Sequence, residues 1–128
     1  MAGNARIFLV AGGASAALAV VLGAFGAHAL RGSLDAGMLA VYQTASQYHL
    51  VHSLGLLAVG LLAARVAPRP SIGWAGWLML AGLVLFSGSL YLLAVTGAGW
   101  LGGITPAGGI AFVAAWICFC VAAARSTL

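Results

Sequence analysis

Charged side chains are nearly absent from this sequence, at 5% of 128 residues, whereas soluble domains carry about 25%. Asp35 is the single acidic residue, lysine is missing, and the basic residues are five arginines. The arginines are too scattered to form a nucleic-acid-binding stripe. One carboxylate also argues against the paired acids and bases of hydrolases and transferases. We therefore predict neither a nucleic-acid-binding protein nor an enzyme.

Cysteine is scarce as well, and the two residues of this type, Cys118 and Cys120, lie two positions apart. Side chains at this spacing on a helix point about 200° away from each other, so the pair can neither share a metal ion nor close a disulfide. We expect both to be buried, inert thiols. The cysteines therefore predict no metal centre.

Long apolar runs are what the sequence does have, and 64% of its residues are hydrophobic. Four stretches without Asp, Glu, Lys or Arg approach or exceed the roughly 20 residues that a helix needs to cross a bilayer. They cover residues 7–30, 48–64, 73–96 and 104–124. The sequence predicts an all-α integral membrane protein, with a single domain over residues 1–128 that forms an antiparallel four-helix transmembrane bundle.

The arginines predict how these spans are oriented. With four spans, four of the five arginines fall on the side of the termini, while Arg31, offset by Asp35, falls on the other side. The positive-inside rule then places both termini in the cytoplasm, or in the matrix for a mitochondrial protein. The arginines on the terminal side are Arg6, Arg65, Arg69 and Arg125.

A secretory signal peptide is the alternative interpretation of the N-terminal segment. Arg6, the apolar run and the alanine-histidine-alanine triplet at 27–29 imitate one. However, the run exceeds the about 7–15 apolar residues of a signal peptide, and cleavage would leave Arg65 and Arg69 opposite the new N-terminus. We expect the segment to be retained as the first span.

The first loop, residues 31–47, is moderately amphipathic. Leu34, Met38, Val41 and Ala45 recur at helical spacing between polar residues. This pattern predicts a short helix at the outer membrane surface, which runs on into the second span or stands alone. We expect Ser33 to be its N-cap, with an acidic side chain in its first turn.

The first span carries a row of small residues at every fourth position: Ala11, Ser15, Ala19, Gly23 and Ala27. Such a row lets another helix backbone approach closely. Because alanine and glycine are common throughout this chain, chance could also produce the row. We interpret it as a helix-packing face that could serve a partner.

Polar side chains gather at the predicted outer end of the bundle, where the first span ends and the second begins. In the second span, Tyr48 and His52, and likewise His49 and Ser53, are four positions apart and are neighbours on one helix face. The candidate polar site comprises His28, Tyr48, His49, His52 and Tyr91.

Three interpretations of these histidines remain open. They could be structural ties that hydrogen-bond to the backbone and to each other at the helix ends. Imidazole titrates near neutral pH, so they could handle protons or contact a quinone. Imidazole also binds haem iron and other metals, although no neighbouring Asp, Glu or Cys completes a ligand set. We favour the structural interpretation and predict no metal and no cofactor.

The order and spacing of four motifs resemble the small four-span membrane proteins grouped as domain of unknown function 423, also called UPF0382, to which the eukaryotic transmembrane protein 256 is related. The resemblance covers nearly the whole chain. It implies an integral inner-membrane protein with no settled activity, and it supplies no catalytic residues. The motifs are GAFGAH (23–28), YHLVHSLGLL (48–57), LFSGSLYLLAVTG (85–97) and ITPAGGIAFVAAW (104–116).

Taken together, these observations predict a non-enzymatic structural or accessory protein of the bacterial inner membrane. Its partners would be the lipid bilayer and either further copies of the chain or a larger membrane complex, with no nucleic acid and no known small-molecule substrate. The alternative is a small transporter, or a protein that handles protons or quinones through the outer-side histidines. Haem or metal binding is the weaker alternative.

Overall fold

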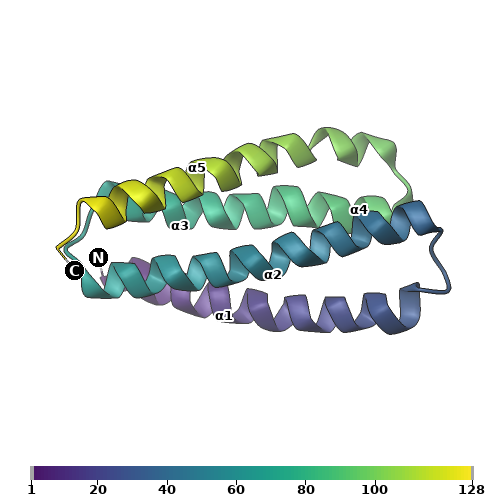
Figure 1. Ribbon diagram of the computed structural model, residues 1–128, viewed down its shortest axis with the longest axis horizontal. Helices are drawn as coiled ribbons and strands as arrows, with labels where there is room; N and C mark the ends of the chain where they lie inside the picture. Colours follow the sequence, from purple (N-terminus) through teal and green to yellow (C-terminus); the bar gives the residue numbers. More distant parts are fainter. Residues whose placement is uncertain (1, 128) are drawn as a thin grey trace.

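The computed structural model describes residues 2–127, which form four long antiparallel helical rods joined by short turns (Figure 1). Both termini lie at one end of the bundle. Four rods are long and apolar enough to cross a membrane, and the described residues contain no strand. The predicted all-helical four-span fold is therefore confirmed. The rods cover Asn4–Leu30, Ala36–Arg65, Pro70–Thr96 and Gly99–Ala124.

The rods are not all uniform α-helices. The first and third each include a wider π-helical turn, and the fourth begins with a 3₁₀ turn. In chain order the elements are α1 (Ala2–Phe25), the π-turn η1 (Gly26–Leu30), α2 (Ala36–Arg65), α3 (Pro70–Gly82), the π-turn η2 (Leu83–Gly88), α4 (Ser89–Thr96), the 3₁₀ turn η3 (Gly99–Gly103) and α5 (Thr105–Ala124).

The second rod begins earlier than the apolar pattern indicated. Residues 36–47, expected at the outer surface, are the first turns of α2 and run without a break into the apolar part. No proline interrupts residues 36–65, so nothing in the backbone chemistry ends the helix between its polar and apolar parts. Gln43, Thr44 and Gln47 remain exposed on this extension.

The N-cap of α2 is Asp35, and the prediction of Ser33 for this position is wrong. The Asp35 carboxylate accepts a hydrogen bond from the backbone N–H of Met38 at 2.8 Å. The Ser33 hydroxyl donates instead to the carbonyl of Ala29, at the end of the preceding rod. Asp35 satisfies a free N–H group of the first turn and places a negative charge at the positive end of the helix dipole.

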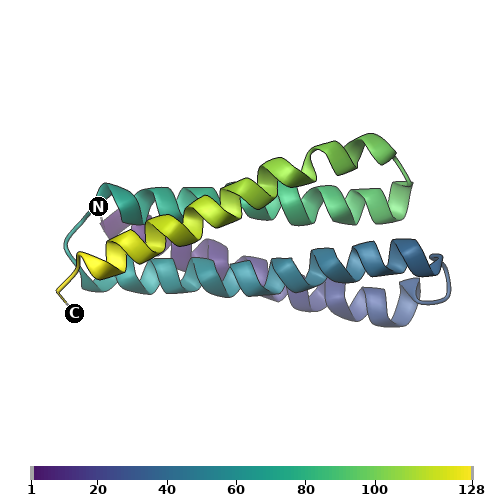
Figure 2. The same ribbon diagram turned by 45° about the horizontal axis from the view of Figure 1, so that its top comes forward.

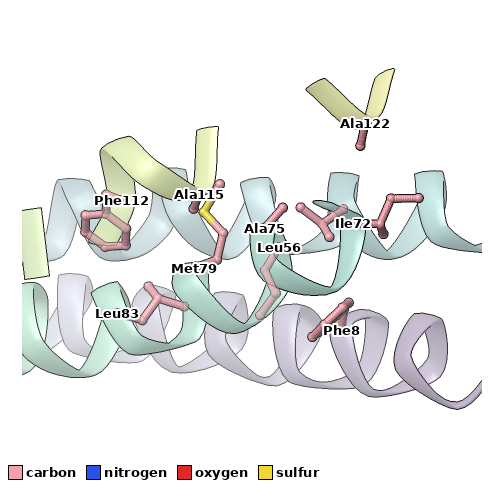
Figure 3. Packing of buried hydrophobic residues seen from close by; sticks show 10 residues of the cluster. Phe8, Leu56, Ile72, Ala75, Met79, Leu83, Phe112, Ala115 and Ala122 are labelled. Atoms are coloured by element: carbon pink, nitrogen blue, oxygen red, sulfur yellow. The ribbon is translucent and has the colours of Figure 1, made fainter. Parts of the chain in front are cut away.

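The rods pack as two pairs, with α2 in the middle of the contacts. Figure 2 shows α1 beside α2, and α5 crossing over the rod that α3 and α4 form. On its other side, α2 contacts α3, η2 and α4. Side chains buried between the pairs come from all four rods, as Figure 3 shows for Phe8, Leu56, Met79 and Phe112. This shared core fixes the helix rotations that place the polar side chains.

The rod of η2 and the rod of α5 touch backbone to backbone. A Cβ atom added at Gly108 would collide with the backbone of Leu85 and Phe86, whereas one at Gly109 would lie 3.7 Å from the Phe86 ring, an ordinary contact. Glycine at 108 is therefore required by the close approach of α5 to the π-turn. Pro106 lies in the first turn of α5, where proline is favoured.

The row of small residues on α1 lies against α2 of the same chain. Ala19 is buried, Ser15 hydrogen-bonds to α2, and Gly23 faces Ser46. The face that we expected to serve a partner is thus largely occupied within the chain, and Ala27 is exposed. The expectation of two buried thiols is wrong for Cys120, which is exposed.

Candidate functional site

A chain of polar side chains crosses the inside of the bundle and joins three helices. His49 on α2 lies at its centre, with Nδ1 at 3.0 Å from the Tyr91 hydroxyl of α4 and Nε2 at 3.1 Å from the Ser15 hydroxyl of α1. Ser15 in turn lies 2.6 Å from the hydroxyl of Ser53, one turn further along α2. His49 and Ser53 are buried, so water does not compete for these bonds.

The direction of each hydrogen bond in this chain follows from counting protons. The Ser53 hydroxyl donates its one proton to the carbonyl of His49 at 2.7 Å, so it must accept from Ser15. Ser15 then has no proton left for His49 and accepts from Nε2–H, which leaves Nδ1 to accept from Tyr91. The arrangement therefore places a proton on Nε2 of His49, and a neutral His49 accepts at Nδ1 from the Tyr91 hydroxyl.

His52 makes a second, separate set of contacts. Its Nδ1 lies 2.8 Å from the carbonyl oxygen of Tyr48 and must donate to it, while its Nε2 accepts from the indole N–H of Trp116 on α5 at 3.1 Å. The ring stacks on Phe112 at a centroid distance of 3.5 Å. His52 is therefore also a neutral imidazole, but with its proton on Nδ1, and neither ring nitrogen is left free.

The predicted polar site does not form one cluster. His49 points toward α1 and α4, whereas His52 points toward α5. Tyr48 stacks on His52 with ring centroids 5.7 Å apart, but its hydroxyl makes no hydrogen bond within residues 2–127. His28 lies on η1, is exposed, and makes no side-chain hydrogen bond in the described part of the chain. The structure thus joins His49 to Tyr91, joins Tyr48 to His52, and leaves His28 apart from both pairs.

An apolar groove opens beside the second pair, between α2, η2 and α5. Its volume is about 840 Å³. Aromatic rings make up much of its wall, and Tyr48 brings the one hydroxyl among the lining residues. The residues that line it include Tyr48, His52, Phe86, Ile110, Phe112 and Trp116. A groove of this size and polarity suits a lipid tail, a lipophilic ring or a side of another helix.

The sequence reasoning missed Trp116 as the partner of His52 and assigned Ser15 to packing alone. Ser53 follows His49 by four residues, which places both on one helix face, so its role was accessible from spacing. The contact between His52 and Trp116 joins residues 64 positions apart. It depends on how α2 and α5 are rotated, which hydropathy does not specify.

The hydrogen bonds of His49 and His52 serve to hold helices together. In the described range, residues 2–127, no three His, Cys, Asp or Glu side chains come close enough to hold a metal ion. The two buried histidines use both ring nitrogens on hydrogen bonds within the chain. A buried polar group with all its partners specifies one arrangement of its helices.

The fold and this internal hydrogen bonding define a small integral membrane protein with four spans. Comparison with known families then identifies it further. The family model described as "Protein of unknown function (DUF423)" matches residues 22–109. The chain belongs to this family, as the resemblance of its four motifs predicted.

Relatives with this family's other name, UPF0382 membrane proteins, match along nearly their whole length. The protein YwdK of Bacillus subtilis is 51% identical over 120 residues, which are 94% of this chain and 98% of the relative. Relatives from Staphylococcus epidermidis and Staphylococcus saprophyticus are 42% and 43% identical, over 91% and 88% of this chain and 94% and 92% of their own lengths. No solved structure matches the chain. The protein is thus a membrane protein of a family whose function is unknown.

Proposed function

We propose that this protein is a non-enzymatic structural or accessory component of the bacterial inner membrane. It acts as a compact four-span unit that joins further copies of itself or a larger membrane complex. Both termini lie in the cytoplasm, because the end of the bundle with the termini carries four of the five arginines. The relatives come from bacteria, which supports the plasma membrane as its location.

The observation that carries this proposal is the use of the buried polar side chains. Ionisable residues in spans are functional candidates by default, yet the ring nitrogens of His49 bond to α1 and α4. Those of His52 bond to its own helix and to Trp116 on α5. Asp35, the single acidic residue of the sequence, caps α2 at the end of the bundle. A nucleophile with a base and an orienting acid is not assembled in residues 2–127, which supports a role outside catalysis.

Photocrosslinking in native membranes tests the accessory role. A photoreactive amino acid is placed at one exposed apolar position on each rod: Val21, Leu54, Leu92 and Ile117. We expect a discrete protein adduct from at least one of these faces, either a dimer of this chain or a complex with one larger protein. Monomer alone from all four positions, together with monomer alone after purification in mild detergent, would contradict the proposal.

A second candidate function is the binding of a quinone or a similar lipophilic ring, and the aromatic groove between α2 and α5 favours it. The free hydroxyl of Tyr48 would donate to a quinone carbonyl. Titration with a short-chain quinone, followed by tryptophan fluorescence, tests this candidate. Saturable quenching that Tyr48→Phe weakens would support it, and quenching that the variant leaves unchanged would count against it.

A further inference from the structure

A second cavity lies at the opposite end of the bundle from the histidines, where the chain termini are. It has a volume of about 620 Å³ and is bounded by the start of α1, the end of α2 and the start of α3. Its wall combines two arginines and an amide with apolar side chains. The residues that matter here are Asn4, Arg6, Leu9, Val10, Arg69 and Ile72.

The guanidinium of Arg69 is the unusual group in this cavity. Its Nε is buried and finds no hydrogen-bond partner among the described residues. Arg69 also precedes the first turn of α3, where Pro70 begins the helix, so its charge adds to the positive end of the helix dipole. Arg6 lines the same cavity from α1. Two cationic groups and a helix N-terminus therefore face one space.

No acidic side chain of the protein can neutralise these arginines. Asp35 is the single carboxylate side chain in the sequence, and it caps the far end of α2. At a rise of about 1.5 Å per residue, the 30 residues of α2 separate Asp35 from this cavity by most of the bundle's length. An arginine that is partly withdrawn from water is stabilised by an anion with hydrogen-bond acceptors.

We propose that this cavity binds the phosphate of an anionic phospholipid. Arg6 and Arg69 hold the phosphate oxygens, and Leu9, Val10 and Ile72 contact the first part of an acyl chain. The cavity lies where the first and third rods begin, at Asn4 and Pro70, so it sits at the depth of lipid headgroups. The apolar wall favours a lipid over free phosphate, because a free ion gains nothing from it. Basic residues at the membrane surface attract anionic lipid.

A lipid titration of the purified protein in mild detergent tests this proposal. The protein is titrated with dioleoyl phosphatidylglycerol, dioleoyl phosphatidylcholine or glycerol 3-phosphate, and thermal unfolding is recorded at each concentration. We expect saturable stabilisation by phosphatidylglycerol alone. Equal stabilisation by phosphatidylcholine would overturn the proposal. Equal stabilisation by glycerol 3-phosphate at the same concentration would also overturn it, because the lipid chains would then be irrelevant.

Three variants that each remove one positive charge locate the binding site. Arg6→Gln and Arg69→Gln should each raise the phosphatidylglycerol concentration for half-maximal stabilisation by about fivefold or more. Arg65→Gln is the control, since Arg65 lies at the same end, is exposed and does not line the cavity. An equal effect of all three variants would mean that the lipid is attracted by overall positive charge and not bound in this cavity, which would overturn the proposal. Arg6 is exposed, so Arg6→Gln remains informative if Arg69→Gln fails to fold.

Discussion

At the scale of single residues, the polar side chains inside this bundle act as connectors. An unsatisfied polar group is costly in hydrocarbon, because no water is present to complete its hydrogen bonds. The protein meets that cost by pairing the groups with one another. Tyr91, His49, Ser15 and Ser53 form a hydrogen-bonded chain across three helices, and for a neutral His49 the order of donors leaves one arrangement of protons.

Removing the first donor of this chain should weaken the fold. Tyr91→Phe keeps the ring but leaves Nδ1 of His49 without a donor, and we expect the free energy of unfolding to fall by about 1 kcal/mol. Denaturation by SDS in mixed micelles measures this change. Tyr48→Phe is the control, since the Tyr48 hydroxyl makes no hydrogen bond within residues 2–127. A loss of equal size in both variants would show that the Tyr91 hydroxyl has no special role.

The sequence predicted part of this residue-level arrangement. Spacing along α2 placed His49 with Ser53 and Tyr48 with His52, because residues four apart share a helix face. Spacing could not assign Ser15 to His49 or Trp116 to His52, since those contacts depend on the rotation of each helix about its own axis. It also grouped His28 with the others by depth alone, whereas His28 is exposed on η1.

At the scale of helices and turns, the shape of the bundle depends on where each helix begins and ends and on how closely neighbouring helices approach each other. Hydropathy located the apolar part of every rod, because 20 apolar residues in a row leave few alternatives. It did not decide whether the amphipathic helix before the second span runs on into that span, as it does in α2 from Ala36. Hydrophobicity measures what can enter the bilayer and not where hydrogen bonding along the helix starts. The π-turn η2 in the third rod likewise has no signature in composition.

The start of α2 should depend on Asp35 and not on Ser33. Asp35→Ala removes the acceptor for the N–H of Met38 and should lower the free energy of unfolding by about 1 kcal/mol. Asp35→Asn retains a capping oxygen and should recover most of the loss. Ser33→Ala should be nearly neutral, because its hydroxyl bonds to the preceding rod. Comparison of the three variants by SDS denaturation checks the assignment, and a larger effect at Ser33 would reverse it.

The contact between α5 and η2 should be sensitive to a single methyl group. Gly108→Ala forces a Cβ into the backbone of Phe86, so we expect a loss of about 1–3 kcal/mol. Gly109→Ala adds the same atom one position along, where there is space, and alanine favours the helix. Thermal unfolding in detergent separates the two variants. Similar stability for both would mean that α5 does not approach η2 as closely as described.

At the scale of the whole molecule, the two ends of the bundle differ in character. The end with the termini carries Arg6, Arg65, Arg69 and Arg125, whereas the other end carries Arg31 beside Asp35 and leads to the histidines. The sequence predicted this division from the number of spans and the positions of the arginines. It could not reveal the cavity around Arg69, because that cavity forms where three rods meet.

The orientation in the membrane should follow this division. A phosphatase that is active only outside the cytoplasm, fused after residue 128, should be inactive, because both termini are expected inside. The same enzyme inserted between residues 32 and 33 should be active. A green fluorescent protein at each position provides the reciprocal control. Activity at the C-terminal fusion would reverse the orientation.

The most direct test of the two buried histidines as structural ties is to measure which of their ring nitrogens carry protons. Nitrogen-15 NMR of selectively labelled histidine in lipid nanodiscs reports which ring nitrogen carries the proton. We expect His49 with its proton on Nε2 and His52 with its proton on Nδ1 at neutral pH, as their partners require. The same tautomer at both positions, or a charged imidazole at His52, would contradict the closed hydrogen bonding and favour a working site.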